Sequence, residues 1–432
     1  MAVSSRAGGP AVAAAPGVLR PCRVPGFEHD ASCGFVRRPL DPAAPQGRQI
    51  DVHFAVLPAL ARHKHPDPVF LFAGGPGQSA IDLAGTASRL LARLSNRRDI
   101  VLVDQRGTGR SAPLMCPEVA PTAPMARLLT AEAQGQRLAA CREALRRLPH
   151  GDLRHYTTWI AMGDFEAVRQ ALGAPRINLI GVSYGTRAAL EYQRQFPQAV
   201  RRVVMDGVVP PDLVLPATFA TDNLAALEQV LAACEAEASC RAAHPALRAQ
   251  WQALVASLPR EVTVAHPVTG MAERFELTAE LLLGLVRGPL YVPSLAAGLP
   301  AAMVEASRGR LEPLVGLASA LLTGRGARLA EGMHHAVVCS EDAPRLEAAA
   351  SARSAGSAAS GPVGRPGGAA VPAVPAPVPR RWSRPRCRGT MRRRRCAPST
   401  TRRTPGSAST ASCSASRRRQ HWWCTKRRRS RS

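Results

Sequence analysis

The chain has 432 residues, 46% of them hydrophobic, and a formal net charge of +26 at pH 7. This length can hold a catalytic domain with an inserted cap, or two domains. The net charge does not by itself predict a nucleic-acid or membrane partner, because it is concentrated in the tail. Residues 348–432 carry 21 of the 57 Lys and Arg residues and none of the 31 Asp and Glu. The chain has no stretch of the ~18 or more uninterrupted apolar residues that a membrane span needs.

The first segments in chain order are an N-terminal stretch and two apolar strands. Residues 1–19 are Ala-rich, contain one Arg and are broken by two prolines, so we expect them to be disordered and a poor signal peptide. "PVFLFAGGPGQSA" at 68–80 predicts a strand that ends in a glycine loop, which can present backbone N–H groups without obstruction by side chains. "DIVLVDQRGTGRSAP" at 99–113 predicts a second strand of this kind.

The segment "RINLIGVSYGTRAALEYQRQFP" at 176–197 predicts a strand, a sharp turn and a helix. Gly181 and Gly185 leave room at the turn, and Ser183 lies at its tip, where a nucleophilic serine would be exposed. The backbone N–H of Tyr184 would point to the place where an oxyanion develops. The alternative is a tight turn in which the glycines serve conformation alone.

Three motifs in this order, "GGPG", "DQRGTGRS" and "GVSYGT", followed by "VVMDGVVPP" at 203–211, resemble the α/β-hydrolase superfamily. Within it, the chain is similar to the prolyl and tripeptidyl aminopeptidase group of serine peptidases over roughly residues 20–347. The resemblance implies an α/β fold, a mostly parallel sheet with flanking helices, whose core spans 20–211. It also implies that Ser183 is the nucleophile and that the backbone N–H groups of Gly75 and Tyr184 form the oxyanion hole.

The resemblance further implies a serine aminopeptidase that releases N-terminal residues or short peptides, with a peptide or small acyl compound as substrate and no cofactor. A carboxylesterase is an alternative within the same fold. The motif residues Asp104, Arg106 and Gly107 are expected to brace their loop, because an Asp/Arg turn beside glycines is commonly a hydrogen-bonded scaffold.

Residues 212–347 are mostly Ala/Leu-rich segments of helical periodicity, and we expect them to form a helical cap that lies over the sheet and shapes the substrate pocket. Near its end stands "HHAVVCSED". By analogy with the resembling aminopeptidases, Glu341 or Asp342 would bind the free α-amino group of a substrate. The alternative is a solvated polar turn. His334 and His335 are expected to be surface or packing residues.

The cysteines before residue 300 fall in three local pairs, Cys22 and Cys33, Cys116 and Cys141, and Cys234 and Cys240. Secreted members of the resembling group tend to have disulfides in such places, which favours a periplasmic or secreted protein, while free buried thiols are the alternative. A metal site is not expected, because the pairs lack Cys-x-x-Cys spacing and are not clustered with His.

The partners of Ser183 are missing from the expected place. In this fold the acid and then the base follow the nucleophile in the chain. No carboxylate follows Glu347, and the only later histidine is His421. Asp206, just after the strand that follows the elbow, and His421 are therefore the candidates left for acid and base. Asp206 is more simply a structural residue, and the resembling family uses a later loop.

The tail, residues 348–432, combines Ala, Pro, Gly and Ser with dense Arg, four cysteines and three tryptophans, and we expect it to be disordered. A basic arm that binds nucleic acid is one interpretation. We favour a frame-shifted translation, in which the last strands and the triad loops are lost. "HWWCT" must be encoded CAY TGG TGG TGY ACN, which reads Leu-Val-Val-His/Tyr two bases later, a sequence typical of a buried strand. A catalytically incomplete protein is therefore a further hypothesis.

Overall fold

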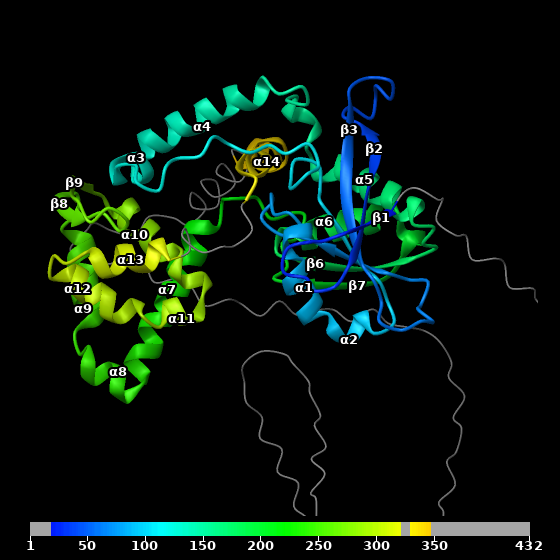
Figure 1. Ribbon diagram of the computed structural model, residues 1–432. Helices are drawn as coiled ribbons and strands as arrows, with labels where there is room; N and C mark the ends of the chain where they lie inside the picture. The colour runs from blue at the N-terminus through cyan, green and yellow to red at the C-terminus, as the bar shows by residue number, and fades with distance from the viewer. Residues whose placement is uncertain (1–18, 321–328, 347–432) are drawn as a thin grey trace, which may run out of the picture. The chain divides into compact units, whose positions relative to one another are not determined.

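The computed structural model describes residues 19–320 and 329–346. Apart from Leu19, which begins the first strand, the two segments predicted to be disordered, residues 1–19 and 348–432, lie outside this part of the chain. A seven-stranded sheet has the order β1-β2-β3-β5-β4-β6-β7 (Figure 1). Its strands are β1 (Leu19–Cys22), β2 (Ala31–Pro39), β3 (Gln49–Leu57), β4 (Val69–Phe72), β5 (Ile100–Val103), β6 (Ile177–Val182) and β7 (Val200–Asp206).

The second half of the sheet is parallel. Strands β1, β2 and β3 are antiparallel neighbours, β3 joins β5 antiparallel, and β5, β4, β6 and β7 run parallel. The three strands predicted from the apolar runs before the glycine motifs are thus side by side as β5, β4 and β6. Because the carboxyl ends of parallel strands meet at one edge, the three glycine-rich loops converge there.

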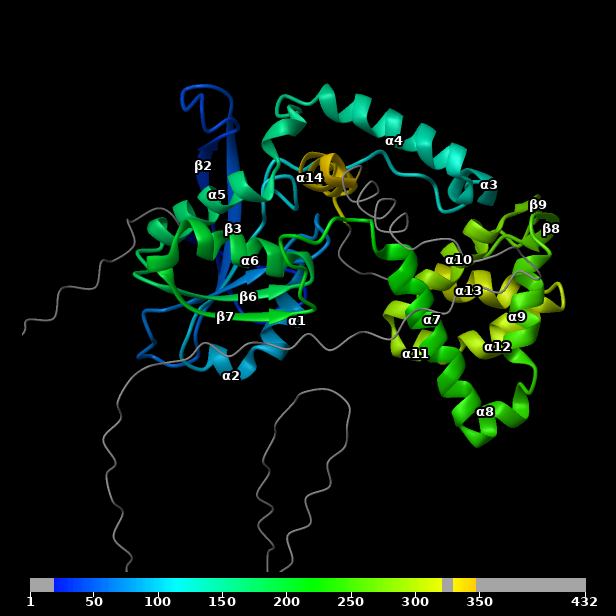
Figure 2. The same ribbon diagram turned by 180° about the vertical axis from the view of Figure 1, so that it is seen from behind.

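The central strands are apolar throughout because both faces of the sheet are covered. Phe70 of β4 and Val101 of β5 enter one hydrophobic core, whereas Leu71 and Leu102, their neighbours in the chain, enter the core on the other face. Figures 1 and 2 show α5 and α6 on the first face and α1 and α2 on the second. The helices of this part are α1 (Ala84–Leu90), α2 (Ala92–Ser95), α3 (Met125–Leu129), α4 (Ala131–Arg146), α5 (Thr158–Ala171) and α6 (Tyr184–Gln195).

A helical unit follows β7 and has a hydrophobic core of its own. Besides its helices it holds a two-stranded hairpin, in which β8 and β9 are antiparallel. Met125 of α3 also belongs to the core of this helical unit, and its backbone N–H donates to Glu273 Oε2 at 2.6 Å. The unit consists of α7 (Phe219–Ala236), α8 (Ala238–Ala243), α9 (Leu247–Ala256), β8 (Arg260–Ala265), β9 (Ala272–Leu277), α10 (Ala279–Arg287), α11 (Pro293–Ala296), α12 (Leu299–Ser307) and α13 (Glu312–Ser319).

The structure differs from the expected domain boundary at the end of the cap. Helix α14 (Glu331–Val337) and the π-helical turn after it (Val338–Asp342) follow the helical unit, but Ala330, Met333 and Val337 are buried in the core of the sheet. The cause is local packing: Gly332 N donates to Leu114 O at 3.0 Å, and a Cβ on Gly332 would come within 2.6 Å of that oxygen. Residues 330–342, predicted as cap, therefore complete the α/β core.

All three predicted cysteine pairs form disulfides, Cys22–Cys33, Cys116–Cys141 and Cys234–Cys240. The alternative of free buried thiols is therefore wrong for these six residues. Cys116–Cys141 closes the segment that contains α3, whose Met125 lies in the core of the helical unit.

Candidate active site

Ser183 stands at the turn between β6 and α6, as the strand, turn and helix pattern predicts. Its backbone has φ 56° and ψ −125°, a conformation that is rare for a residue with a side chain. Two backbone hydrogen bonds hold Ser183 in this conformation: Ser183 N donates to Asp206 O of β7 at 2.8 Å, and Ser183 O accepts from Thr186 N at 2.9 Å. Strained backbone of this kind at a strand-to-helix turn is characteristic of a nucleophile elbow.

Two glycines make the elbow possible. A Cβ on Gly181 would lie 2.5 Å from Gly185 O, and a Cβ on Gly185 would lie 2.0 Å from Phe72 O of β4. Both distances are far below any real carbon–oxygen contact. The strand β6, the helix α6 and the end of β4 can therefore approach this closely only while both positions remain glycine.

We expect Gly185→Ala to lower the free energy of unfolding by at least about 2 kcal/mol, because the added methyl has no space and the backbone must move. Gly163→Ala in the middle of α5 is the matched control, since its only neighbour within 4 Å is the end of Arg38 at 3.6 Å. That substitution should stabilise by ~0.5–1 kcal/mol through helix propensity. Urea unfolding measures both, and equal effects would contradict the packing argument.

The glycine loop after β4 lies against the elbow. A Cβ on Gly74 would be 3.2 Å from Ser183 Cβ, and Gly74 N donates to Gln78 Oε1 at 3.1 Å. Gly75 has φ +112°, in the region that favours glycine. The oxyanion roles of the Gly75 and Tyr184 N–H groups remain predictions. Tyr184 follows Ser183 in the chain, and Gly75 follows Gly74, which lies against Ser183.

Helix α14 contacts the same loop from the other side. Ala330 N donates to Gly77 O at 2.9 Å, and His334 Nδ1 lies 3.3 Å from Pro76 O. A Cβ on Gly75 would be 2.9 Å from Leu329 Cδ1. The sequence prediction of a surface or packing role for His334 is confirmed in this sense: it packs against the loop beside Ser183.

Burial lowers the pKa of His334, with the neighbouring His335 acting in the same direction. A histidine held neutral in the fold disfavours folding once the unfolded chain can take up its proton. We therefore expect the free energy of unfolding to fall as the pH drops below about 6.5, and His334→Gln to flatten that fall. Urea titrations at several pH values test this. His63→Gln, at an exposed position, is the control and should leave the slope unchanged.

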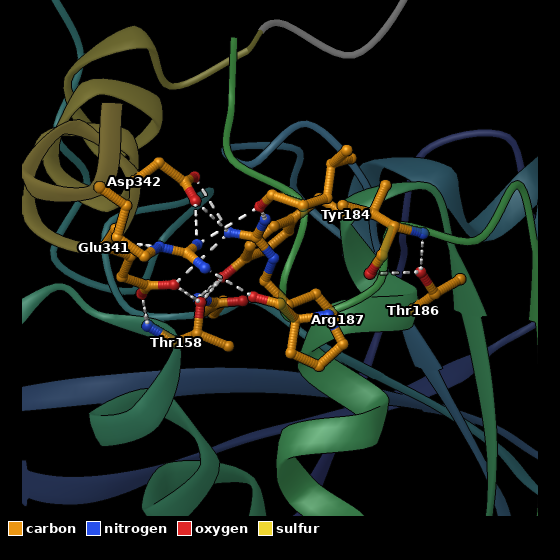
Figure 3. Close-up of polar contacts among 11 residues, drawn as sticks. Thr158, Tyr184, Thr186, Arg187, Glu341 and Asp342 are labelled. Carbon is orange, nitrogen blue, oxygen red and sulfur yellow. Dashed lines mark hydrogen bonds and ion pairs between the residues drawn. The ribbon is translucent and has the colours of Figure 1, made fainter. Parts of the chain in front are cut away.

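A buried chain of hydrogen bonds fixes the side chain of Tyr184 (Figure 3). Its hydroxyl accepts from Gln105 Nε2 at 3.1 Å and lies 2.6 Å from Thr158 Oγ1. Thr158 in turn donates from Oγ1 to Glu341 Oε2 at 2.9 Å and from its backbone N–H to Oε1 at 2.5 Å. Burial raises the pKa of the Tyr184 hydroxyl and is also the main cause of the raised pKa of Glu341. Thr158 and Gln105 were not singled out from the sequence.

Asp342 makes ion pairs within the chain. Its carboxylate lies 3.0 Å from Arg187 Nη1 and 2.5 Å from Arg345 Nη2, and it has no exposed surface. The alternative of a solvated turn is therefore wrong for Asp342, and the residue has no free surface with which to meet a substrate. Glu341 is engaged by Thr158, so a role in binding a substrate amine stays a prediction that needs those bonds to be exchanged.

The "DQRGTGRS" motif has the bracing role expected of it. Arg106, almost fully buried, donates to both carboxylate oxygens of Asp164, at 2.7 and 2.9 Å, and to the Leu40 and His155 carbonyls. Asp104 accepts from Ser79 Oγ at 2.7 Å and from two backbone N–H groups. Burial raises the pKa of Asp104, and Gly107 has φ +90°.

The triad partners of Ser183 are not assembled in the part of the chain that the structure describes. No histidine in residues 19–320 or 329–346 hydrogen-bonds to the Ser183 hydroxyl, and His421 lies outside these ranges. Asp206 meets the elbow through its backbone carbonyl, while its side chain is exposed. The described site thus has a positioned serine beside a glycine loop.

Two absences among the described residues bear on cofactors and membranes. These residues contain no group of three or more His, Cys, Asp or Glu side chains that could hold a metal ion. None of the helices within residues 19–320 and 329–346 has the length and apolar character to cross a membrane.

Comparison with known proteins agrees with this geometry. Residues 67–233 match the family model described as "alpha/beta hydrolase fold". The chain is 33% identical over 192 residues to a tripeptidyl aminopeptidase of Streptomyces coelicolor, covering 41% of this chain and 35% of the relative. It is 27% identical over 322 residues to the serine protease Hip1 of Mycobacterium tuberculosis, covering 69% of this chain and 61% of the relative.

A third relative is the proline iminopeptidase of Xylella fastidiosa, 28% identical over 146 residues, covering 33% of each chain. The matches thus span between about one third and three fifths of the lengths of these relatives. The fold and the resemblance to the peptidase group of the α/β-hydrolases, both expected from the motifs, are confirmed.

Proposed function

We propose that this chain, which carries the α/β-hydrolase fold, is a serine hydrolase of the aminopeptidase type that releases N-terminal residues or short peptides. The observation that carries the proposal is the strained backbone of Ser183, φ 56°, held at the carboxyl edge of the sheet directly beside the glycine loop. A serine that serves only as a turn residue gains nothing from such strain. The relatives are named as peptidases, which favours a peptide substrate over an ester or a non-peptide amide.

In the proposed reaction, the Ser183 hydroxyl attacks the carbonyl carbon of the scissile bond. The backbone N–H groups of Tyr184 and Gly75 donate to the oxygen that becomes negatively charged. In the frame-corrected chain, a base from the restored segment takes the Ser183 proton and gives it to the leaving amine. Water then attacks the acyl-enzyme while the same base takes a proton from it, and the base returns that proton to Ser183 as the acyl group leaves. The reaction needs no cofactor.

The second candidate is a catalytically incomplete protein with this fold. The specific observation in its favour is that no described histidine hydrogen-bonds to Ser183. It predicts that Ser183 is unreactive in every version of the chain, whereas the proposed hydrolase becomes reactive once the reading frame after residue 347 is corrected.

The test is hydrolysis of aminoacyl and tripeptidyl arylamides by the frame-corrected chain. We expect turnover that Ser183→Ala abolishes and that Ser257→Ala, a surface serine, leaves unchanged. Substrates with an acetylated N-terminus should be poor if the enzyme is an aminopeptidase. Efficient hydrolysis of short-chain esters with inert arylamides would instead indicate a carboxylesterase, and an inert corrected chain would indicate the second candidate.

The three disulfides support the proposal that the protein works in an oxidising compartment, because disulfides persist there and are rare where thiols are kept reduced. Mass spectrometry of the alkylated protein from its native host tests this. Free thiols at the six cysteines would contradict it.

A further inference from the structure

A cavity of about 720 Å³, within the size range of small-molecule sites, lies at the turn between β2 and β3. Its walls come from this turn, from α4 and from the segment that follows α4, and neither Ser183 nor the glycine loop lines it. The buried Arg106 holds two of these walls together, because its Nη1 donates to Leu40 O at 2.8 Å and to His155 O at 3.0 Å. The cavity is therefore a fixed part of the fold.

Positive charge is in excess in this cavity. Four arginines line it: Arg48, Arg142, Arg146 and Arg154. Arg154 is neutralised by Asp152 through hydrogen bonds at 2.9 and 2.7 Å. The other three guanidinium groups form no ion pair or hydrogen bond with a side chain or backbone group of residues 19–320 and 329–346. The remaining carboxylate of the lining, Asp41, accepts from the Ala43 N–H at 2.8 Å. Three cations without partners thus face a single carboxylate.

The positions of the arginines on α4 are not explained by the stability of the helix. Arg142 and Arg146 are one turn apart, and like charges at this spacing destabilise a helix. Arg147, the next residue, instead pairs with Glu143 at 3.3 Å and does not line the cavity. The C-terminal end of a helix favours a cation in its last turn. That preference accounts neither for Arg142, one turn earlier, nor for Arg48, which belongs to a different segment.

The chain itself has no acidic segment that could cover these cations. Residues 1–18, 321–328 and 347–432 contain a single acidic side chain, that of Glu347. A further strand after residue 347 that continued the parallel half of the sheet would pair with β7, and β5, β4 and β6 lie between β7 and β3. The anion that balances the three arginines therefore comes from a ligand.

We propose that this cavity binds a phosphate ester of a small organic molecule. A phosphate group carries about two negative charges and three acceptor oxygens. The planar guanidinium group of Arg donates to such oxygens in pairs, which gives strong and directional hydrogen bonds. The side chains of Leu40, Leu148 and Leu153 also line the cavity. They offer an apolar surface to the organic part of the ligand.

The experiment is isothermal titration calorimetry of the full chain with phenyl phosphate at an ionic strength of about 0.15 M, where weak surface attraction is screened. Arg48→Gln and Arg142→Gln should each raise the Kd at least about tenfold, because each removes a charge-assisted contact. Arg147→Gln is the matched control, since it removes the same charge from the same helix outside the cavity, and it should leave the Kd unchanged. Benzoate, which has the same ring and a single negative charge, should bind more weakly.

The arginine-rich tail also attracts anions, so a readout at the cavity itself is needed. Phenylglyoxal modifies accessible arginines, and mass spectrometry of the peptides shows which ones have reacted. Phenyl phosphate should protect Arg142 and Arg146 and leave Arg147 as reactive as before. Protection of all three, or of none, would contradict a site in the cavity.

The phosphate could belong to a soluble compound or to a lipid headgroup, and co-sedimentation with phosphatidylcholine vesicles that contain phosphatidic acid separates these sources. Loss of vesicle binding in the Arg48→Gln/Arg142→Gln double variant would assign the headgroup. Vesicle binding that the double variant retains, together with lost binding of phenyl phosphate, would assign a soluble ester.

Three results would overturn the proposal. The chain could show no saturable binding of phenyl phosphate, or Arg142→Gln and Arg147→Gln could have equal effects on the Kd, or benzoate could bind as tightly as phenyl phosphate. Circular dichroism of each variant shows that the fold is kept. None of these readouts depends on catalysis, so the result is separate from that of the arylamide test.

Discussion

The uncorrected chain, with its arginine-rich tail, is expected to hydrolyse aminoacyl arylamides only about 10³- to 10⁴-fold faster than water does, far below the frame-corrected chain. That residual is what oxyanion donors and substrate binding supply in serine hydrolases that lack triad members. Ser183 has a strained backbone beside a glycine loop, but without a base to take its proton the hydroxyl is a weak nucleophile. Labelling by a fluorophosphonate, followed by mass spectrometry of the Ser183 peptide, should be slow for the same reason.

The controls for this prediction are the two residues left as candidate partners. His421→Ala and Asp206→Asn should not change the residual rate or the rate of labelling. Fast labelling of the uncorrected chain that disappears in either variant would show that a triad assembles from these residues, and the inference of a lost reading frame would then be wrong.

Replacing Arg106 should cost more stability than any surface ion pair. In Arg106→Leu the Asp164 carboxylate, 1% exposed, keeps only a hydrogen bond from Arg38 at 3.3 Å. Removing one partner of a buried pair costs ~3–5 kcal/mol, because the remaining charge stays buried. Equilibrium unfolding in urea, followed by a probe in the sheet domain, measures the loss.

The matched control is Arg23→Ala. Arg23 pairs with Asp30 at 3.0 Å, but the two side chains are 70% and 74% exposed. Water and salt screen such a pair, so the change should stay below about 1 kcal/mol. Comparable losses in the two variants would show that burial does not set the strength of these pairs.

The local parts of the site were predictable from the sequence. The nucleophile turn, the glycine loop and the bracing role of Arg106 each follow from residues close together in the chain, where glycine positions and apolar runs determine the backbone. The partner of Arg106 was not predicted, because Asp164 looks like any polar residue of an amphipathic helix until the fold brings it to the loop.

Contacts between segments far apart in the chain could not be predicted from the sequence for the same reason. Thr158 and Glu341 are separated by 183 positions, and nothing in either segment marks the other. The helical periodicity of residues 331–337 was visible, but periodicity does not say which core a helix will join. For that reason α14 was predicted to belong to the cap, whereas Met333 and Val337 are buried in a hydrophobic core that they share with the sheet strands.

The late position of α14 in the chain has a consequence for folding during synthesis. His334 contacts Pro76 across 258 positions, and Arg137 binds Glu331 across 194. A nascent chain that already holds β1 to β7 still lacks the helix that covers Leu114 and Leu145, since the whole helical unit must be translated first. Closing contacts at such separations is slow, because loop entropy is lost before the contact is gained. We therefore expect the serine elbow to form early on the ribosome, within a loosely packed intermediate that exposes apolar surface. Chaperones should continue to bind this intermediate until residue 342 has left the exit tunnel.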